Sequence, residues 1–521
     1  MAHSTAIQLG IILSITLILL GCSSSQVLRS DTQFEVLPSD HFAGTLLART
    51  MPSIRGDDFS GNLLLRDGHQ ALIERLYLID AAEKRIDAQY FLWNDDKTGK
   101  LLLQRLVKAA NRGVQVRVLL DGLSITEHHK QLAYLSDHPN IDIRVYNPIE
   151  GSQMLARVVN FAKDFDRLNQ RMHNKSFVFD GSVAITGGRN IGDAYFFFDE
   201  HYNFYDMDVL SVGPVVRQVS NGFNYYWNSP WSTPVAKLYE TDNDVESAEF
   251  INALVESDFN YILSFGDARE VANSVFLTKY YRKLYNQLIW APTYFIYDKP
   301  GGFEPLADDK PKEVAVEIAE LVMNSREEVL IESAYLVLDD RSIDIFQQLY
   351  HSGVKVKVLT NSMASNNLLM NHAGYAMVRE NTLAAGAELY ELKPSFKSCP
   401  KMVVIEANCE HHLIGLHAKT AVFDRKSVYI GSLNFNIRSA FINTETALVI
   451  ESPEIATQLA ETILNNMALS NSWQAILHEG EVAWRVEQEN EIVLLMEEPL
   501  TTWLERFGAD FLTWIPGAEY Y

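Results

Sequence analysis

Two distant parts of this chain carry the same order of sequence patterns, and this repeat restricts the fold more than any other feature. The first half predicts a strand, a helix and a strand over residues 85–91, 102–110 and 114–120. The second half repeats this order over residues 331–336, 345–349 and 354–358. Matching positions are 245 residues apart at Tyr90 and Tyr335, and 240 apart at the helix-ending Gly113 and Gly353. A nearly constant offset indicates two duplicated α/β lobes, in which helices cover a sheet.

A second pattern lies at the same place in both halves. It reads H-x-K-x4-D and occupies residues 173–180 and 417–424, so the two histidines are 244 residues apart. Each copy is followed by glycine, a small residue, any residue and asparagine, at residues 187–190 and 431–434. One such motif arises by chance in roughly a few per cent of chains like this one. Two copies in a repeated frame predict one active site assembled from two halves.

The two copies supply matching side chains for chemistry at phosphorus. Residues two apart on a strand face the same way, so each motif histidine projects with its lysine. A neutral imidazole can attack phosphorus, and a protonated one can donate to the leaving alcohol. Lysine and asparagine side chains can bind the phosphate oxygens. The candidate catalytic residues are His173, Lys175, Asp180, His417, Lys419 and Asp424, with Asn190 and Asn434 as phosphate-binding residues.

Carboxylates are needed to fix the tautomers of the two imidazoles. Asp206 and Glu445, downstream of the two motifs, are the candidates for this orienting role. Asp180 and Asp424 directly precede predicted turns. Although they belong to the motif, we expect these two aspartates to order the turn and the sheet.

The N-terminus is typical of an export signal. Residues 1–21 contain no Lys, Arg, Asp or Glu, and the apolar run of residues 7–20 is short for a spanning helix. Residues 19–22 resemble a bacterial lipobox, in which Cys22 becomes lipidated, although no basic residue precedes the apolar run. The alternative is an uncleaved anchor. With Ser23 after the cysteine, we expect a lipoprotein of the bacterial cell envelope, on the periplasmic side and at the outer membrane.

The other two cysteines, Cys399 and Cys409, permit either a disulfide or two unpaired thiols. Cys409 also lies near His411, His412 and His417, so a zinc site is the main competing chemistry. The spacing of these four residues fits no compact ligand pair. We therefore expect neither a metal nor another cofactor.

The chain resembles the phospholipase D superfamily, whose mark is two H-x-K-x4-D motifs in one chain. It is most similar to bacterial cardiolipin synthases of the C type, over residues 171–175, 187–196, 372–375 and 388–394. The resemblance covers most of residues 60–470. It implies two similar lobes, each a mixed sheet flanked by helices, about a pseudo-twofold axis with the active site between them. It also implies no metal, with His173 as the nucleophile and His417 as the general acid.

The same resemblance implies transfer of a phosphatidyl group from a glycerophospholipid, such as phosphatidylethanolamine or phosphatidylglycerol, to a second alcohol. Cardiolipin is the product when that alcohol is phosphatidylglycerol. The alternative is an exported phospholipase D that hydrolyses phospholipids to phosphatidic acid. The net charge of −23 disfavours a nuclease of the superfamily. The expected partners are phospholipids and a membrane surface, without nucleic acid, and the oligomeric state stays open.

These patterns divide the chain into six segments. We predict a signal peptide at 1–21, a tether at 22–45, the first lobe at 46–235, an aromatic-rich insertion and linker at 236–310, the second lobe at 311–470 and a C-terminal extension at 471–521. The extension carries a helical stripe of aromatic side chains at Trp503, Phe507, Phe511 and Trp514. We expect this stripe to pack on the body of the protein, with an interfacial membrane helix as the alternative.

Overall fold

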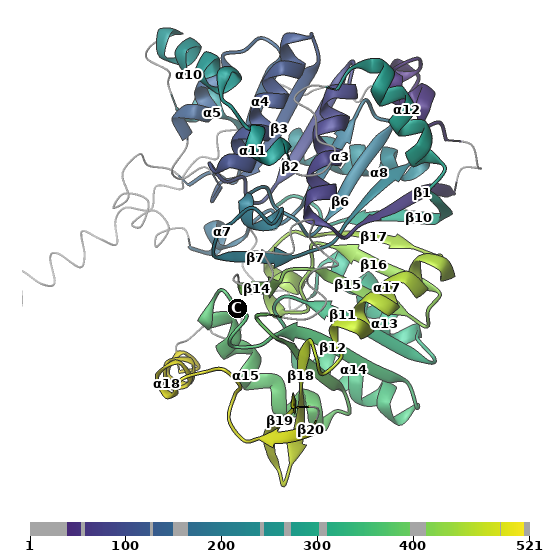
Figure 1. The fold of residues 1–521 in the computed structure, drawn as a ribbon, viewed down its shortest axis with the longest axis vertical. Helices are drawn as coiled ribbons and strands as arrows, with labels where there is room; N and C mark the ends of the chain where they lie inside the picture. The colour runs from purple at the N-terminus through teal and green to yellow at the C-terminus, as the bar shows by residue number, and fades with distance from the viewer. Residues whose placement is uncertain are drawn as a thin grey trace, which may run out of the picture.

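The structure is a computed structural model of the 521-residue chain. It describes residues 39–53, 58–124, 129–149, 165–239, 244–264, 272–301, 310–395, 413–489 and 491–514. Two α/β lobes contain the two repeats and lie one above the other in Figure 1. The predicted signal peptide, Cys22, most of the tether, Cys399 and Cys409 lie outside the described residues.

The strands pair in the same order in both lobes. The strands of the first lobe, in pairing order, are β9 (Ser232–Pro234), β4 (Ile141–Tyr146), β3 (Gln115–Asp121), β2 (Arg85–Tyr90), β5 (Ser176–Phe179), β6 (Val183–Gly187), β8 (Asp208–Val212) and β1 (Phe59–Leu65). Their counterparts in the second lobe are β18 (Ser472–His478), β13 (Glu388–Leu392), β12 (Lys355–Asn361), β11 (Glu328–Ser333), β15 (Lys419–Phe423), β16 (Ser427–Gly431), β17 (Thr446–Ile450) and β10 (Ile289–Tyr297). This shared order confirms the predicted duplication.

The two half-sheets are joined at β1 and β10. The first residues of β10, up to Pro292, pair antiparallel with β1, and residues from Thr293 onward pair antiparallel with β17. β1 and β10 occupy equivalent edges of their half-sheets and run antiparallel, so a pseudo-twofold axis lies between them. The predicted fold class of two similar lobes about such an axis is confirmed. β10 lies in the stretch that was predicted to be an insertion and linker, and there it supplies the strand that joins the lobes.

Helices cover both faces of this continuous sheet. The outer helices are α3 (Gly68–Ala81) and α4 (Lys97–Asn111) in the first lobe, and α13 (Glu313–Asn324) and α14 (Asp340–His351) in the second. On the other face, α8 (Pro214–Trp227) and α17 (Pro453–Asn466) pack on an apolar core that contains strand residues of both lobes. Because both lobes contribute to this core, it fixes the position of one half of the site relative to the other.

Within the predicted C-terminal extension, β18 completes the repeated strand order, and a hairpin and one helix follow. Strands β19 (Glu481–Gln488) and β20 (Glu491–Leu495) extend the sheet beyond β18, and α18 (Trp503–Leu512) follows. The expectation that the aromatic stripe packs on the body is wrong, because Trp503 is 67% exposed and Trp514 is 86% exposed. The helix contacts α15 (Leu369–Ala384) through its opposite side, where Gly508 and Ala509 permit a close approach. Among the described residues, no helix has both the length and the apolar character needed to cross a bilayer.

Candidate active site

The two motif histidines meet where the lobes are joined by backbone hydrogen bonds. His173 N donates to Thr444 O at 2.9 Å, and His417 N donates to Tyr205 O at 2.7 Å. Each histidine is therefore held by the main chain of the other lobe. Strands β7 (Tyr202–Tyr205) and β14 (Leu413–Leu416), one from each lobe, pair in parallel just before these contacts. This arrangement fixes the position of His417 directly after the end of β14.

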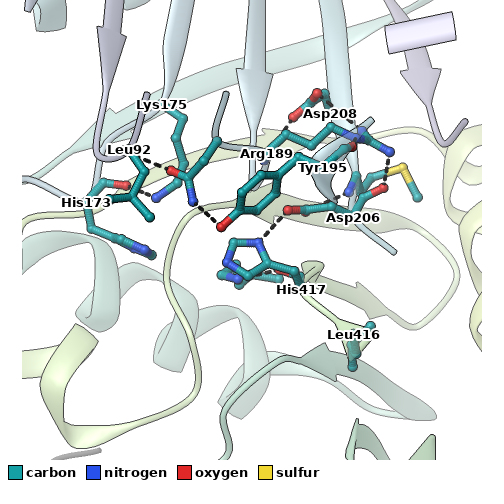
Figure 2. A network of polar contacts seen from close by, with 12 residues as sticks. Leu92, His173, Lys175, Arg189, Tyr195, Asp206, Asp208, Leu416 and His417 are labelled. Carbon is teal, nitrogen blue, oxygen red and sulfur yellow. Dashed lines mark hydrogen bonds and ion pairs between the residues drawn. The ribbon is translucent and has the colours of Figure 1, made fainter. Parts of the chain in front are cut away.

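Each imidazole also contacts a carboxylate from the opposite lobe. His173 Nδ1 lies 2.8 Å from Glu445 Oε2, and His417 Nδ1 lies 2.5 Å from Asp206 Oδ2. All four side chains are at least nine-tenths buried, and Figure 2 shows the pair of His417 and Asp206. A carboxylate can only accept, so each Nδ1 carries the proton and each Nε2 keeps its lone pair for chemistry. The two carboxylates predicted to orient the histidines are thus brought to them, but across the lobe boundary.

The electrostatics of the site favour neutral imidazoles beside ionised carboxylates. Burial lowers the pKa of His173 to about 4, although Glu445 opposes this change. Burial also lowers the pKa of His417 to about 3, and the charge of Lys419 adds to the effect. For Asp206, burial would raise the pKa, but His417 and nearby cations hold it at about 2. The pKa of Glu445 is lowered in the same way, by His173 against the effect of burial. Both Nε2 atoms are therefore unprotonated at neutral pH.

Each motif lysine lies beside its histidine, as predicted, but the two histidines precede strands β5 and β15 instead of lying on them. Lys175 Nζ donates to His173 O at 2.5 Å, and Lys419 Nζ donates to His417 O. Burial lowers the pKa of Lys175 well below its usual value and that of Lys419 to about 8. Two poorly solvated ammonium groups next to the imidazoles are suited to bind an anionic phosphodiester.

An aromatic ring accompanies each lysine. Lys175 Nζ lies 5.4 Å from the centre of the Phe91 ring, and Lys419 Nζ lies 5.9 Å from that of Tyr335. Phe91 and Tyr335 are 244 residues apart, which is the separation of the two histidines. The predicted match of Tyr90 with Tyr335 is therefore off by one residue. Tyr90 is buried, and its hydroxyl accepts a hydrogen bond from Arg75 Nε at 3.3 Å.

The two motif aspartates lie at turns, and among the described residues their side chains accept hydrogen bonds from main-chain amides. Asp180 accepts hydrogen bonds from the backbone amides of Glu83, Lys84 and Arg85. Asp424 makes the equivalent bonds to the amides of Arg326, Glu327 and Glu328. Both aspartates have positive φ, +47° and +51°, at the turns that follow β5 and β15. These contacts favour the ordering role for Asp180 and Asp424 over the catalytic one.

The two motif asparagines differ in how their amides are used. Asn190 Nδ2 donates to the Tyr195 hydroxyl at 3.0 Å, and its Oδ1 accepts from Leu92 N at 3.3 Å (Figure 2). Asn434 is buried, and within the described part of the chain its Oδ1 has no hydrogen-bond partner. Asn434 thus has a free acceptor among the described residues, whereas Asn190 is already engaged with Leu92 and Tyr195.

The small residue two positions before each motif asparagine, Gly188 or Ser432, was given no role in the sequence analysis. Ser432 Oγ donates to Glu445 Oε2 at 2.5 Å. Gly188 is its counterpart, and a Cβ at Gly188 would lie 2.2 Å from Asp206 Oδ1. The position is therefore small because the orienting carboxylate occupies the space beside it. The repeated pattern of glycine, small residue, any residue and asparagine was the available signal.

No repeated sequence pattern indicated which aromatic side chains surround His417. Tyr195 and Phe204 each lie with their ring centres 5.1 Å from that of His417. The ring centre of Phe91 lies 5.0 Å from that of His173. These rings exclude water from the imidazoles and limit their rotation.

A metal centre finds no support in the described ranges. No group of three or more His, Cys, Asp and Glu side chains there could hold a metal ion. Of the four residues considered for zinc, Cys409, His411 and His412 lie outside the described residues, and His417 pairs with Asp206.

Fold and site together define a duplicated α/β enzyme with paired histidines, and comparisons with known proteins agree. The family described as "Cardiolipin synthase, PLD-like domain" matches residues 76–227 and 318–467. Cardiolipin synthase C of Escherichia coli is 36% identical over 84% of this chain and 91% of its own length. A cardiolipin synthase of Clostridium perfringens is 23% identical over 77% of this chain and 69% of its own. The solved structure of phosphatidylserine synthase from Haemophilus influenzae shares the fold, with a TM-score of 0.54, 15% identity, and coverage of 83% of this chain and 92% of that one.

The chain belongs to the family of phospholipase D-like cardiolipin synthases. The predicted resemblance is therefore confirmed, and so is the prediction that the protein is an enzyme acting on phospholipids. Its general chemistry is phosphatidyl transfer.

Proposed function

We propose that the enzyme moves a phosphatidyl group through a covalent phosphohistidine, with phosphatidylethanolamine or phosphatidylglycerol as donor. Phosphatidylglycerol is the acceptor, and cardiolipin is the product. The observation that carries this proposal is the crossed pairing of His173 with Glu445 and His417 with Asp206, at 2.8 and 2.5 Å. It leaves two unprotonated Nε2 atoms, each on a histidine whose main-chain oxygen accepts from a motif lysine.

In the first step, His173 Nε2 attacks phosphorus and the bond to the head-group alcohol breaks. His417, protonated when the anionic substrate binds, gives its Nε2 proton to the departing alkoxide. Glu445 and Asp206 stabilise the positive charge on the imidazoles. Lys175, Lys419 and the amide of Asn434 bind the non-bridging oxygens.

In the second step, His417 removes the proton of the incoming alcohol, and that oxygen attacks phosphorus. The bond between phosphorus and His173 Nε2 breaks, which restores the neutral imidazole. Water in place of the alcohol would give phosphatidic acid, so an exported phospholipase D is the alternative outcome of the same site. A nuclease is less suitable, because a chain with a net charge of −23 repels polynucleotides.

One assay separates these functions. Purified enzyme is incubated with labelled phosphatidylethanolamine and phosphatidylglycerol, and the lipids are resolved. Cardiolipin supports the synthase, phosphatidic acid with free head group supports the hydrolase, and DNA cleavage without lipid turnover contradicts both. His417→Ala should accumulate labelled phospho-enzyme when the head group is a good leaving group. His173→Ala should form none, and the reverse pattern would exchange the two roles.

We also propose that Cys22 is lipidated and places the enzyme at the bacterial cell envelope, on the periplasmic side of the outer membrane. The support is the lipobox-like sequence of residues 19–22. Cells treated with globomycin should accumulate a larger precursor. Unchanged mobility without palmitate labelling would show that the chain is not a lipoprotein.

A further inference from the structure

Helix α18 carries an exposed apolar surface that the fold does not cover. Five large apolar side chains, four on the helix and one just after it, are each 60% exposed or more: Trp503, Leu504, Phe507, Phe511 and Trp514. At 3.6 residues per turn these side chains fall within one arc, about 100° wide. The charged residues of the helix, Glu505, Arg506 and Asp510, lie outside this arc. We call these five side chains the aromatic face.

Buried ion pairs hold the segment before α18 against the second lobe. Glu498 accepts from Arg379 Nη2 at 2.8 Å and lies 3.0 Å from His372 Nε2, both on α15. His372 and Arg379 also hold the pKa of Glu498 at about 2, against the effect of burial. The other side of α18 rests on α15, where Ala509 is buried. The exposed aromatic face therefore belongs to a well-anchored helix, and Figure 1 shows α18 at the edge of the second lobe, beside α15.

A path of contacts links the helix that carries the aromatic face to the active site. Lys419 lies over the ring of Tyr335, whose hydroxyl donates to Asn367 Oδ1 at 3.0 Å. The next residues, Leu368 and Leu369, are 50% and 37% exposed. Leu369 lies beside Gly508 of α18, because a Cβ at that glycine would be 3.5 Å from Leu369 Cδ2. An unbroken path of contacts thus runs from the motif lysine to the exposed helix.

The size and chemistry of this face decide what it binds. A ten-residue helix is about 15 Å long, too small for the roughly 800 Å² per partner that a stable dimer buries. The zone between head groups and acyl chains accepts tryptophan and phenylalanine side chains and needs no fixed partner shape. With a net charge of −23, the protein is repelled by anionic lipid, so electrostatic attraction does not account for membrane binding. An apolar contact remains.

We propose that the aromatic face of α18 inserts into the interfacial zone of a phospholipid bilayer and seats the active site on its lipid substrate. This proposal rests on the proposed lipid transfer. The insertion is apolar, so it does not depend on anionic lipid. It is also separate from an anchor at Cys22, because the two lie at opposite ends of the chain.

Tryptophan quenching by brominated lipid tests the insertion directly. The full-length protein carries His173→Ala, so that the lipids stay intact, and phosphatidylcholine vesicles carry bromine on their acyl chains. We expect quenching that is largely absent in Trp503→Phe/Trp514→Phe, which keeps the aromatic face but lacks both reporters. Phe507→Ser/Phe511→Ser keeps the reporters and should also lose this quenching. Val275→Ser changes an exposed apolar residue of the first lobe, 66% exposed, and should change nothing. Because the readout is local, a lipid anchor at Cys22 does not imitate it.

Activity then separates this proposal from the proposed function. With His173 intact, Phe507→Ser/Phe511→Ser should lower turnover of vesicle lipid about tenfold or more. Turnover of monomeric dihexanoyl-phosphatidylethanolamine should stay unchanged. Equal quenching in all variants, or a dimer that the serine substitutions dissociate in sedimentation velocity, would overturn the membrane proposal. Quenching without turnover of either lipid would instead contradict the proposed function and leave the membrane surface standing.

Discussion

At the scale of single residues, each histidine depends on a carboxylate from the other lobe. Glu445→Gln keeps the shape of the side chain but removes the charge that fixes the tautomer and stabilises the imidazolium of His173. We expect kcat to fall by about 10²–10⁴-fold, as when a buried aspartate that orients a catalytic histidine is replaced by asparagine. The phospho-enzyme should form correspondingly slowly in single-turnover experiments. An unchanged rate of its formation would show that Glu445 does not act on His173.

Proton uptake on substrate binding is a second consequence at this scale. Burial gives His417 a pKa of about 3, so the imidazole is neutral in the free enzyme at pH 7. A bound anionic phosphodiester raises this pKa, and the site takes up roughly one proton. The complex holds more protons than the free enzyme, so affinity falls as pH rises. It falls further above about pH 8, where Lys419 loses its charge.

Calorimetry measures this uptake. A short-chain phosphonate analogue is titrated at one pH in buffers with different enthalpies of ionisation, and the slope of the binding heat gives the number of protons. A buffer-independent heat would contradict the protonation of His417 on substrate binding. His417→Ala should abolish the uptake, whereas His173→Ala should retain it.

At the scale of elements, the motif aspartates hold a turn to the residues that lead into a neighbouring strand. Asp180→Ala leaves three partly buried amides, at residues 83–85, without an acceptor. We expect a loss of about 1–3 kcal/mol in the free energy of unfolding. Asp424→Ala is the matched control and should cost less, because most of its amide partners are exposed. Denaturant unfolding measures both losses.

The same variants separate the ordering role from the catalytic one. Where the protein is fully folded, Asp180→Ala should keep kcat within a few-fold of the unsubstituted enzyme. A hundredfold loss of kcat in a folded protein would return Asp180 to the catalytic group.

The sequence predicted individual helices and strands better than it predicted the contacts between the two lobes. Gly113 and Gly353 end their helices as predicted, with φ of +94° and +83°. These features depend on local geometry, which a sequence carries. That Glu445 reaches His173, and that β10 joins the half-sheets, depends on how the lobes dock, for which no local pattern exists. The spacing of the aromatic residues correctly predicted a helix with one apolar face. Periodicity alone does not predict whether another part of the protein covers that face.

At the scale of the whole molecule, the net charge of −23 acts against anionic membranes. Raising the ionic strength from about 10 to about 150 mM shortens the screening length from roughly 30 to roughly 8 Å. If the enzyme docks on lipid as proposed, binding to phosphatidylglycerol vesicles should strengthen several-fold over this range. Binding to phosphatidylcholine vesicles should change little. Vesicle sedimentation measures both, and weaker binding at high salt would reveal a local basic surface that overcomes the net charge.

The crossed carboxylates also bear on the ancestry of the chain. One lobe alone has a histidine without its carboxylate and a carboxylate without its histidine. A single-lobe ancestor would therefore have needed a second copy of itself, joined edge to edge as β1 and β10 are now, and closed by twofold symmetry. Both subunits of such a homodimer come from one gene, so every substitution appears in both halves of the site. Fusion into one gene would remove that restriction, and the different residues at Gly188 and Ser432, and at Asp206 and Glu445, are what independent drift of two once-identical subunits would leave.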